Sequence, residues 1–380
     1  MIGLELVGLK ARPSAFKTNV AGRLTSKGDC VVMFPTNGVG FGHFTRLLAI
    51  AKRMKAANDE LEIIFFTTMP TLHLLKPYGI PSHHISGPKH FKGMTSEDWN
   101  SLLEEELNVC FETHRPSMFL FDGAFPYRGM LRAIQHRTSM KKLWMRRGMF
   151  RKGSSIPIDS IGHFDSIIHP EDSVVDSSNS LEHGIQQIRC PPIVMLDENE
   201  LLSKHQVRSR LGLPAEAIVV YIQLGAGEIN NIDSDIRLTV ESLLTNSDVH
   251  IVLGESMIGS RIEIELPRVR ILRDYPNSVY FNGFDATIQA GGYNSFHETR
   301  SFGLPALFYP NLNTGMDDQL SRCLVAEQEG WGIVLKSRTE KSISESCGSL
   351  LNLIGSVQKT SYQNGAGELS EKLLKVMLHE

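Results

Sequence analysis

The sequence has few of the features that mark disulfide-rich, metal-binding or membrane-spanning proteins. It holds only five cysteines in 380 residues, and no two of them form a C-x-x-C pair, which disfavours a redox or zinc motif and fits a reducing cytoplasm. No window approaches 18 consecutive apolar residues, so no membrane span is expected. The net charge of −3 gives no reason to expect nucleic acid or another polyanion over the whole surface.

The composition is that of a globular protein with more than one domain. Hydrophobic residues make up 41% of the chain, which is enough for packed cores, and 380 residues suit two domains better than one. Residues 1–27 form an N-terminal extension rich in Lys and Arg. A surface extension is favoured over a targeting segment, because Glu5 and Lys10 interrupt the apolar core that a signal peptide needs.

Short apolar runs alternate with helical patterns over residues 28–190, the expected first domain. Residues 43–58 place apolar side chains on one face of a helix. Alternation of this kind predicts parallel strands in an open, doubly wound sheet. The runs typical of buried strands are 30–34, 61–68, 117–122 and 141–146.

The pattern restarts after a break that runs through a polar stretch to a proline-containing and acidic connection at 188–204. The second set of strands is expected within 211–230 and at 249–256, 269–274, 285–292 and 305–311. The sequence therefore predicts an α/β protein with two Rossmann-like domains, 28–190 and 191–365, and a ligand cleft at the carboxyl ends of the strands. Residues 366–380 are expected to form a C-terminal helix that packs back on the first domain.

The first glycine-rich loop, TNGVGFG at 36–42, does not match the known nucleotide fingerprints. A G-x-G-x-x-G motif starting at Gly38 needs glycine at position 43, where His43 stands, and the second strand ends in Thr67-Thr68 instead of an acidic ribose ligand. A P-loop pattern is missing too. His43 opens a helix beside this loop, where the helix N-terminus disfavours its protonated form, so we interpret it as a general base. A histidine that only fills space is the alternative.

The second informative stretch is AGGYNSFHE at 290–298, which follows a predicted strand. Gly292, Asn294 and Ser295 fall where a helix begins, and a helix N-terminus with a hydroxyl and an amide suits an anion. Glu298 lies one turn further and can accept hydrogen bonds from two ribose hydroxyls. An ordinary capping box explains Ser-x-x-Glu equally well. Asp317, Asp318 and Gln319 return after the next strand, however, and together these groups indicate a nucleotide-sugar site.

On these residues the chain resembles the GT-B glycosyltransferases. AGGYNSFHE is similar to the UDP-sugar signature of the UDP-glycosyltransferases, and Gly42-His43 is similar to the glycine loop of the MurG-type family 28 enzymes. One departure is Ala290, which stands where the plant-type signature has a phosphate-binding histidine. The resemblance covers roughly residues 30–340, with little specificity between its two motifs.

The resemblance implies a role for each matched residue. Asp122, at the end of 117–122, would orient His43, although a turn residue or helix N-cap is the alternative for this position. The residues that would bind the donor are Gly225, Gly227, Leu272, Arg273, Gly292, Asn294, Ser295, Glu298, Asp318 and Gln319. Of these, Ser295 and Asn294 would hold the diphosphate, Glu298 the ribose, and Asp318 and Gln319 the sugar.

The acceptor side is less defined. Gly40, Gly42 and Arg46 would face the acceptor or a phosphate, and Arg46 as a solvated helix residue is the alternative. Arg146 and Arg147 belong to 140–153, which holds six basic residues among apolar ones. This segment fits a solvated face, a site for a phosphorylated or lipid-linked acceptor, or a peripheral contact with the inner face of the membrane. His83, His84 and His169 show no ligand spacing and are expected at the surface.

The function that follows is an inverting, hexosyltransferase-type glycosyltransferase that uses a UDP-sugar and an unidentified hydroxyl acceptor in the cytoplasm. No Asp-x-Asp motif is assigned to a metal, so no cofactor and no required divalent ion is expected. A non-hydrolysing UDP-sugar 2-epimerase and a non-catalytic nucleotide-sugar-binding partner of a glycosyltransferase complex are the alternatives. Neither the sugar nor the oligomeric state follows from these motifs.

Overall fold

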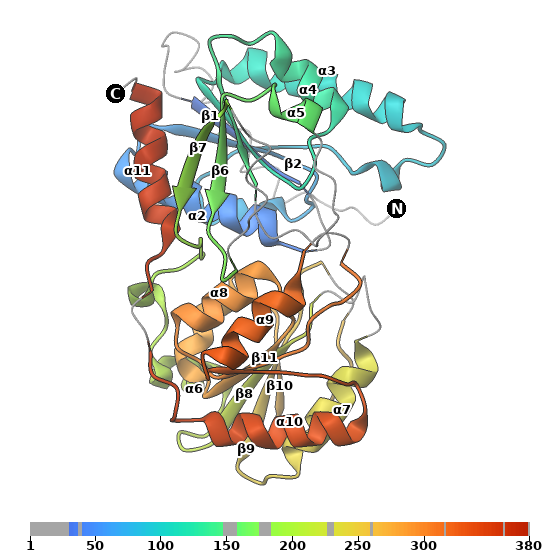
Figure 1. The fold of residues 1–380 in the computed structure, drawn as a ribbon, viewed down its shortest axis with the longest axis vertical. Helices are drawn as coiled ribbons and strands as arrows, with labels where there is room; N and C mark the ends of the chain where they lie inside the picture. The colour runs from blue at the N-terminus through green and yellow to red at the C-terminus, as the bar shows by residue number, and fades with distance from the viewer. Residues whose placement is uncertain are drawn as a thin grey trace, which may run out of the picture.

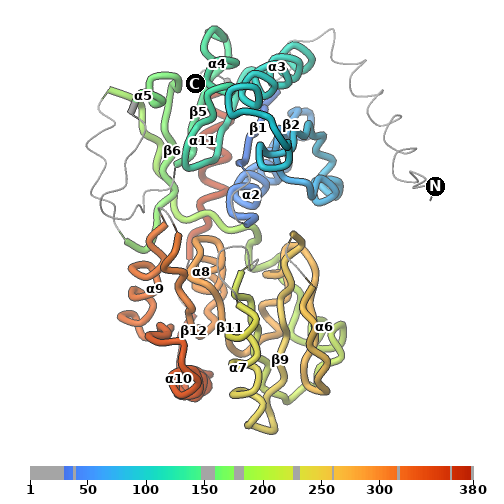
Figure 2. The backbone as a smooth tube through the Cα atoms, turned by 90° about the vertical axis from the view of Figure 1, so that its right-hand side faces the viewer, coloured from blue at the N-terminus to red at the C-terminus, as the bar shows by residue number. Residues whose placement is uncertain are grey.

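The computed structural model describes residues 30–36, 40–146, 158–174, 184–225, 232–258, 261–314, 317–359 and 362–378. These residues form two α/β domains, which lie one above the other in Figure 1 and are seen from the side in Figure 2. The expected pair of parallel, doubly wound sheets is confirmed. None of the helices in these ranges is long and apolar enough to cross a membrane.

The first sheet has seven strands, and each described pair of neighbours is parallel. Its central strands are continuous runs of buried residues, as expected of a sheet covered on both faces. Pro35, the last residue of its strand, pairs with Asp122, the last residue of the neighbouring strand in the sheet. The loop that follows Pro35 therefore begins beside Asp122. The strand order is β3 (Ser82–His84), β2 (Glu62–Thr67), β1 (Cys30–Pro35), β4 (Met118–Asp122), β5 (Lys141–Met145), β6 (Ser166–Pro170) and β7 (Gln186–Cys190).

The second sheet has six strands, also parallel in each described pair. Its order is β10 (Val269–Leu272), β9 (Val249–Gly254), β8 (Ile218–Gln223), β11 (Ala286–Gln289), β12 (Ala306–Phe308) and β13 (Gly332–Val334). The α-helices are α2 (Gly42–Ala57), α3 (Ser96–His114), α4 (Arg128–Gln135), α5 (Ile158–Ile161), α6 (Lys204–Leu211), α7 (Asp233–Leu244), α8 (Tyr293–Ser301), α9 (Gln319–Gln328), α10 (Glu340–Leu353) and α11 (Gly365–Leu378). Short 3-10 helices lie at Leu72–Tyr78, Pro88–His90, Glu198–Glu200 and Asn277–Gly283.

Helix α11 returns from the second domain to the first and packs beside α2, as Figure 1 shows. Its buried face, which includes Leu369 and Leu373, joins the apolar core that contains Leu47 of α2. The Ser370 hydroxyl donates a hydrogen bond to the Ile50 carbonyl at 3.1 Å. The two ends of the described chain therefore contribute to the same domain.

Several strands lie where the sequence predicted a break or gave no strand. Strands β6 and β7 extend the first sheet into the region read as a connection, and β3 and β13 add three-residue edges. Strand β7 is an edge strand in which only Ile188 and Cys190 are buried. A strand with one covered face carries no continuous apolar run, and this is why the sequence pattern missed it.

Two surface assignments made from the sequence are wrong. Leu143, Trp144 and Met145 are buried in β5, so they are not exposed to a membrane surface. Residues 147–153 of the same basic segment lie outside the described residues. His169 is only 5% exposed, whereas His83 is half-buried and His84 is exposed, as expected. The N-terminal extension, 1–27, is also outside the described part of the chain.

The start of α11 should tolerate one glycine substitution and not another. A Cβ at Gly365 would lie 1.9 Å from the Pro191 carbonyl oxygen, whereas a Cβ at Gly367 would approach its nearest neighbour only to 4.0 Å. We expect Gly365→Ala to lower the free energy of unfolding by about 1–3 kcal/mol through overpacking. Gly367→Ala should raise it by up to about 1 kcal/mol, because alanine favours the helix. Urea denaturation of both variants measures the difference, and equal stabilities would contradict the close packing at Pro191.

Candidate functional site

A cleft of about 430 Å³ opens between the two domains. The first domain lines it with the loop after β1 and the start of α2, including Gly40, Gly42 and His43. The second domain lines it with loops that follow β8, β10, β11 and β12. The carboxyl ends of both parallel sheets therefore face the cleft, which is where open α/β sheets bind ligands.

His43 and Asp122 are in contact at the first-domain wall. The Nδ1 atom of His43 lies 2.6 Å from Oδ1 of Asp122, and the His43 side chain is 17% exposed. If Nδ1 carries the ring proton and donates it to this carboxylate, Nε2 keeps the lone pair. Asp122 is buried at the end of β4, so its role is neither that of an exposed turn residue nor that of a helix N-cap.

Arg46 completes this group and also lines the cleft. Its side chain is 1% exposed, so it is not a solvated helix residue. Its Nε and Nη2 donate to the two oxygens of Asp122 at 3.0 and 2.7 Å, and Nη2 also lies 2.8 Å from Nδ1 of His43. Burial alone raises the pKa of Asp122, but the charges of Arg46 and His43 outweigh burial and hold that pKa below its usual value.

Arg46 also reaches the second domain. Its Nη1 lies 3.5 Å from Oδ1 of Asn294, and its guanidinium lies over the Tyr293 ring at 5.4 Å from the centroid. Asn294 in turn donates through Nδ2 to the Gly42 carbonyl at 3.4 Å. The start of α2 and the start of α8 are therefore held against each other across the cleft.

Helix α8 directs its N-terminus into the cleft and is not closed by a capping box. Its N-cap is Gly292, which offers no side-chain cap, and Ser295 lies inside the first turn instead of at the cap. The first backbone N–H groups of a helix have no carbonyl partner within it, and they carry a partial positive charge. Gly292, Asn294 and Ser295 all line the cleft. This end of α8 can therefore bind an anion.

Glu298 lines the same cleft from the next turn of α8. It accepts a hydrogen bond from the Ser278 hydroxyl at 3.0 Å. Burial raises its pKa from 4.5 to about 7, and the bonds from Ser278 and the Met195 backbone only partly oppose this rise. Since the folded protein keeps a proton that the unfolded chain loses, this carboxyl lowers stability as the pH rises from about 4.5 to about 7. A ligand that donates hydrogen bonds to it reverses part of that cost.

The other predicted donor residues divide into two groups. Gly225, with a positive φ of 103°, and Gln319 line the cleft. Asp318 does not line it, because its carboxylate caps α9 by accepting from the backbone and hydroxyl of Ser321. Asp317 faces the cleft instead, while its carboxylate binds Arg322.

Leu272, Arg273 and Arg146 also lie outside the cleft lining. The Leu272 carbonyl accepts from the Glu255 backbone, and Arg273 forms an ion pair with the Glu255 carboxylate at 2.6 Å. Arg146 is 4% exposed at the end of β5, near the Trp144 ring. Gly227 and Arg147 fall outside the described residues.

Residues that the sequence did not single out connect the domains at the cleft. Tyr275 places its hydroxyl 2.9 Å from the Thr45 hydroxyl, and its ring lies 5.4 Å from that of Phe41. Behind α8, Asp172 of the first domain binds the buried Arg322 of α9 at 2.8 Å. No local pattern marks these residues, because their partners are more than one hundred positions away in the chain.

The comparisons with known proteins agree with this architecture. No family model matches the chain. An uncharacterised glycosyltransferase of Methanosarcina acetivorans is 32% identical over 337 residues, which cover 82% of this chain and 86% of the relative.

Solved structures with the same fold are far more distant in sequence. MurG of Acinetobacter baumannii superposes with a TM-score of 0.59 at 13% identity, over 91% of this chain and 99% of that one. The spinosyn rhamnosyltransferase SpnG, complexed with thymidine diphosphate, superposes with a TM-score of 0.58 at 14% identity, over 92% of this chain and 96% of that one. A Listeria monocytogenes protein provisionally assigned as a UDP-N-acetylglucosamine 2-epimerase superposes with a TM-score of 0.61 at 12% identity, over 93% of this chain and 96% of that one.

The buried pair Arg46–Asp122 should show strong coupling in a double-mutant cycle. Arg46→Met leaves Asp122 buried without its main counter-charge, so we expect a loss of about 3–5 kcal/mol in the free energy of unfolding. Asp122→Asn should cost a similar amount, because it leaves the buried Arg46 guanidinium without its counter-charge. The double variant should lose at least about 1 kcal/mol less free energy of unfolding than the two single variants lose together. Denaturant unfolding of the four proteins measures this coupling, and strict additivity would contradict it.

Proposed function

Because the chain belongs to the GT-B glycosyltransferases, we propose that it moves a hexose from a UDP-sugar to an acceptor hydroxyl with inversion, using His43 as the general base. The observation that carries this proposal is the contact between His43 and Asp122 on one wall of the cleft, opposite the N-terminus of α8. A base on one side and an anion site on the other suit a single displacement at the anomeric carbon. The acceptor oxygen attacks from the His43 side as the nucleoside diphosphate leaves toward α8.

His43 acts through Nε2 in this proposal. With Nδ1–H donated to Asp122, the lone pair on Nε2 takes the proton of the acceptor hydroxyl as the new glycosidic bond forms. Asp122 fixes the ring and its tautomer, and Arg46 fixes Asp122 through two hydrogen bonds. General-base assistance of this kind supplies roughly 10²–10⁴ in rate.

The leaving diphosphate is bound by the start of α8. Negative charge grows on the phosphate oxygen as the sugar–oxygen bond breaks, and the N–H groups and partial charge of the helix end stabilise it more in the transition state than in the ground state. The Ser295 hydroxyl and the Asn294 amide are within the same cleft wall. No step of this proposal requires a divalent ion.

Glu298 is the residue proposed to select a ribonucleotide. A carboxylate can accept from the 2′- and 3′-hydroxyls of ribose together, and a deoxyribose lacks the first of them. UDP should therefore bind more tightly than dTDP. Gly225 and Gln319 line the same cleft. In this proposal Gly225 allows close approach of the backbone to the phosphates from the other side, and Gln319 contacts the sugar.

The epimerase alternative has less support from the cleft. That reaction needs several carboxylates available around the sugar. Two of the carboxylates that line the cleft are already paired with cations, Glu255 with Arg273 and Asp317 with Arg322. Conversion of a UDP-sugar to its 2-epimer without an acceptor would favour the epimerase, and formation of a glycosylated acceptor would favour the transferase.

UDP affinity should depend on pH through Glu298. Since the pKa of this carboxyl is about 7 before binding, and ribose hydroxyls favour its ionised form, UDP should bind about ten times more weakly at pH 6 than at pH 8. Calorimetric titration with UDP, dTDP, GDP and ADP measures this. Glu298→Gln is the matched control. The UDP phosphate titrates in the experiments with both proteins, but only the wild type has a carboxyl at position 298 that titrates. Equal pH dependence in both proteins, or tighter binding of another nucleotide, would remove the ribose assignment.

His43→Ala should lower turnover by roughly 10²–10⁴ while UDP affinity stays within about twofold, because the base acts in the chemical step and not in donor binding. Turnover is measured as UDP released from a set of UDP-hexoses with hydroxyl acceptors. His90→Ala is the control, since His90 is exposed and does not line the cleft. Near-normal turnover of His43→Ala would exclude this residue as the base.

A further inference from the structure

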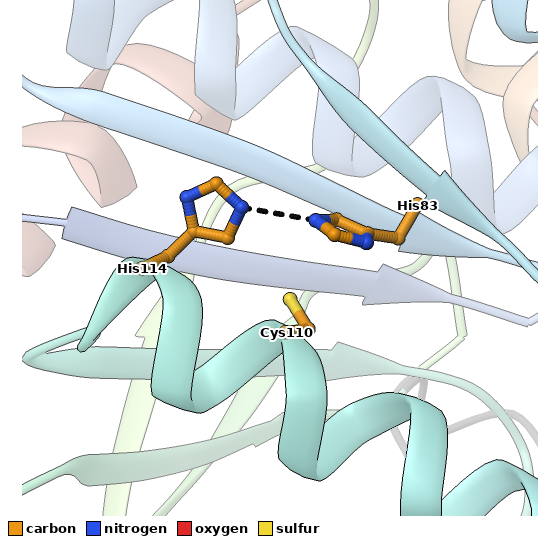
Figure 3. Close-up of side chains that lie close together, drawn as sticks. All are labelled: His83, Cys110 and His114. Carbon is orange, nitrogen blue, oxygen red and sulfur yellow. Dashed lines mark hydrogen bonds between the residues drawn. The ribbon is translucent and has the colours of Figure 1, made fainter. Parts of the chain in front are cut away.

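A second group of chemically reactive side chains lies in the first domain, away from the cleft. Figure 3 shows His83, Cys110 and His114 turned toward one another, the first from β3 and the other two from α3. The Nε2 atoms of the two histidines are 2.9 Å apart. One ligand atom from each of the three residues lies within 4.8 Å of the other two.

The secondary structure explains why the three groups converge. Cys110 and His114 are four residues apart, so they lie one above the other on the same face of α3. That face packs on the sheet beside its short edge strand β3, where His83 pairs with Phe66 of β2. The Phe66 ring stacks on the His83 ring at 6.4 Å between centroids. The ligand atoms are therefore held by rigid elements and not by loops.

The facing side chains suit a metal ion. Two facing Nε2 atoms can share one proton, and a cation between them would use both lone pairs instead. A bound cation also deprotonates a coordinating thiol outright, so Cys110 would bind as a thiolate.

Glu62 supplies the outer contact that metal-bound histidines commonly have. Its Oε1 lies 3.5 Å from Nδ1 of His114, and its side chain is largely buried at the start of β2. When Nε2 of His114 binds a cation, the ring proton is on Nδ1, which points to this carboxylate. Such a carboxylate–histidine pair fixes the tautomer and the ring orientation in zinc sites.

We propose that His83, Cys110 and His114 bind one zinc ion, with water in the fourth position. Two imidazoles and one thiolate are ligands that zinc prefers. Zinc–nitrogen bonds of about 2.0–2.1 Å place two tetrahedral nitrogen ligands about 3.3 Å apart, so the histidines need to separate by only a few tenths of an ångström. On binding, the thiol releases its proton to solvent and a sulfur–zinc bond forms.

The role of this ion is structural. None of its three ligands lines the cleft. Glu62 pairs with Cys30, the first residue of β1, whereas His43 lies in α2, beyond the other end of that strand. The ion would tie the end of α3 to a three-residue edge strand whose only described sheet neighbour is β2.

The test uses the full-length protein, stripped of metal by a chelator under reducing conditions and then dialysed against Zn²⁺. We expect one zinc per chain by atomic emission, and a rise of roughly 5 °C in Tm at saturating zinc. Cys110→Ser and His83→Asn should retain less than about a tenth of the zinc under the same conditions. Cys347→Ser, a buried cysteine of the second domain, and His84→Asn, the exposed neighbour of His83, should bind as the wild type does.

Two results would overturn the proposal. One is a wild-type protein that takes up no zinc, and the other is equal zinc binding by Cys110→Ser and His83→Asn. If those two variants do not fold, Co²⁺ binding is measured instead, by absorption spectroscopy of the wild type and Cys347→Ser. One equivalent of Co²⁺ should produce a thiolate-to-cobalt charge-transfer absorption in both, and its absence would overturn the proposal equally.

Discussion

The ion pair between Arg46 and Asp122 is the constraint on which the rest of the cleft depends. Both groups are buried, so neither charge is tolerable without the other, and the two hydrogen bonds between them fix their relative position. His43 takes its orientation from Asp122. Asn294 and Tyr293 contact the same guanidinium from the other domain. The orientation of the proposed base and the position of the proposed diphosphate site are thus set by one side chain.

A second buried ionic group acts behind α8 in a similar way. Asp172 comes from the first domain, and it binds Arg322 of α9 and His297 of α8. Burial opposes ionisation of Asp172, but Arg322 and His297 hold its pKa below the usual value. Buried charges of this kind contribute little net stability, yet removing one partner is costly. Their arrangement therefore fixes how the domains meet more than how firmly each one folds.

The sequence predicted what local patterns record and missed what distant packing decides. Continuous apolar runs identified the central strands, while the half-exposed β7 gave no such signal. The glycine loop pointed to His43, and the family resemblance pointed to Asp122. Arg46 was predicted to face the acceptor or a phosphate, but its helical position could not show that it binds a buried carboxylate. Asp318 was chosen over Asp317, although only the fold shows which one caps α9. The four-residue spacing of Cys110 and His114 is visible in the sequence, but only the structure shows that both lie on α3 and that His83 comes to them from β3.

Helix α11 has a consequence for how the chain reaches its native state during synthesis. The apolar core of the first domain includes Ala366, Leu369, Leu373 and Met377, together with residues of β1 and α2. These side chains are synthesised after the whole second domain. Until then, the surface of α2 that α11 covers in the finished protein has no partner from α11. The first domain can therefore complete its core only after the second domain has been made.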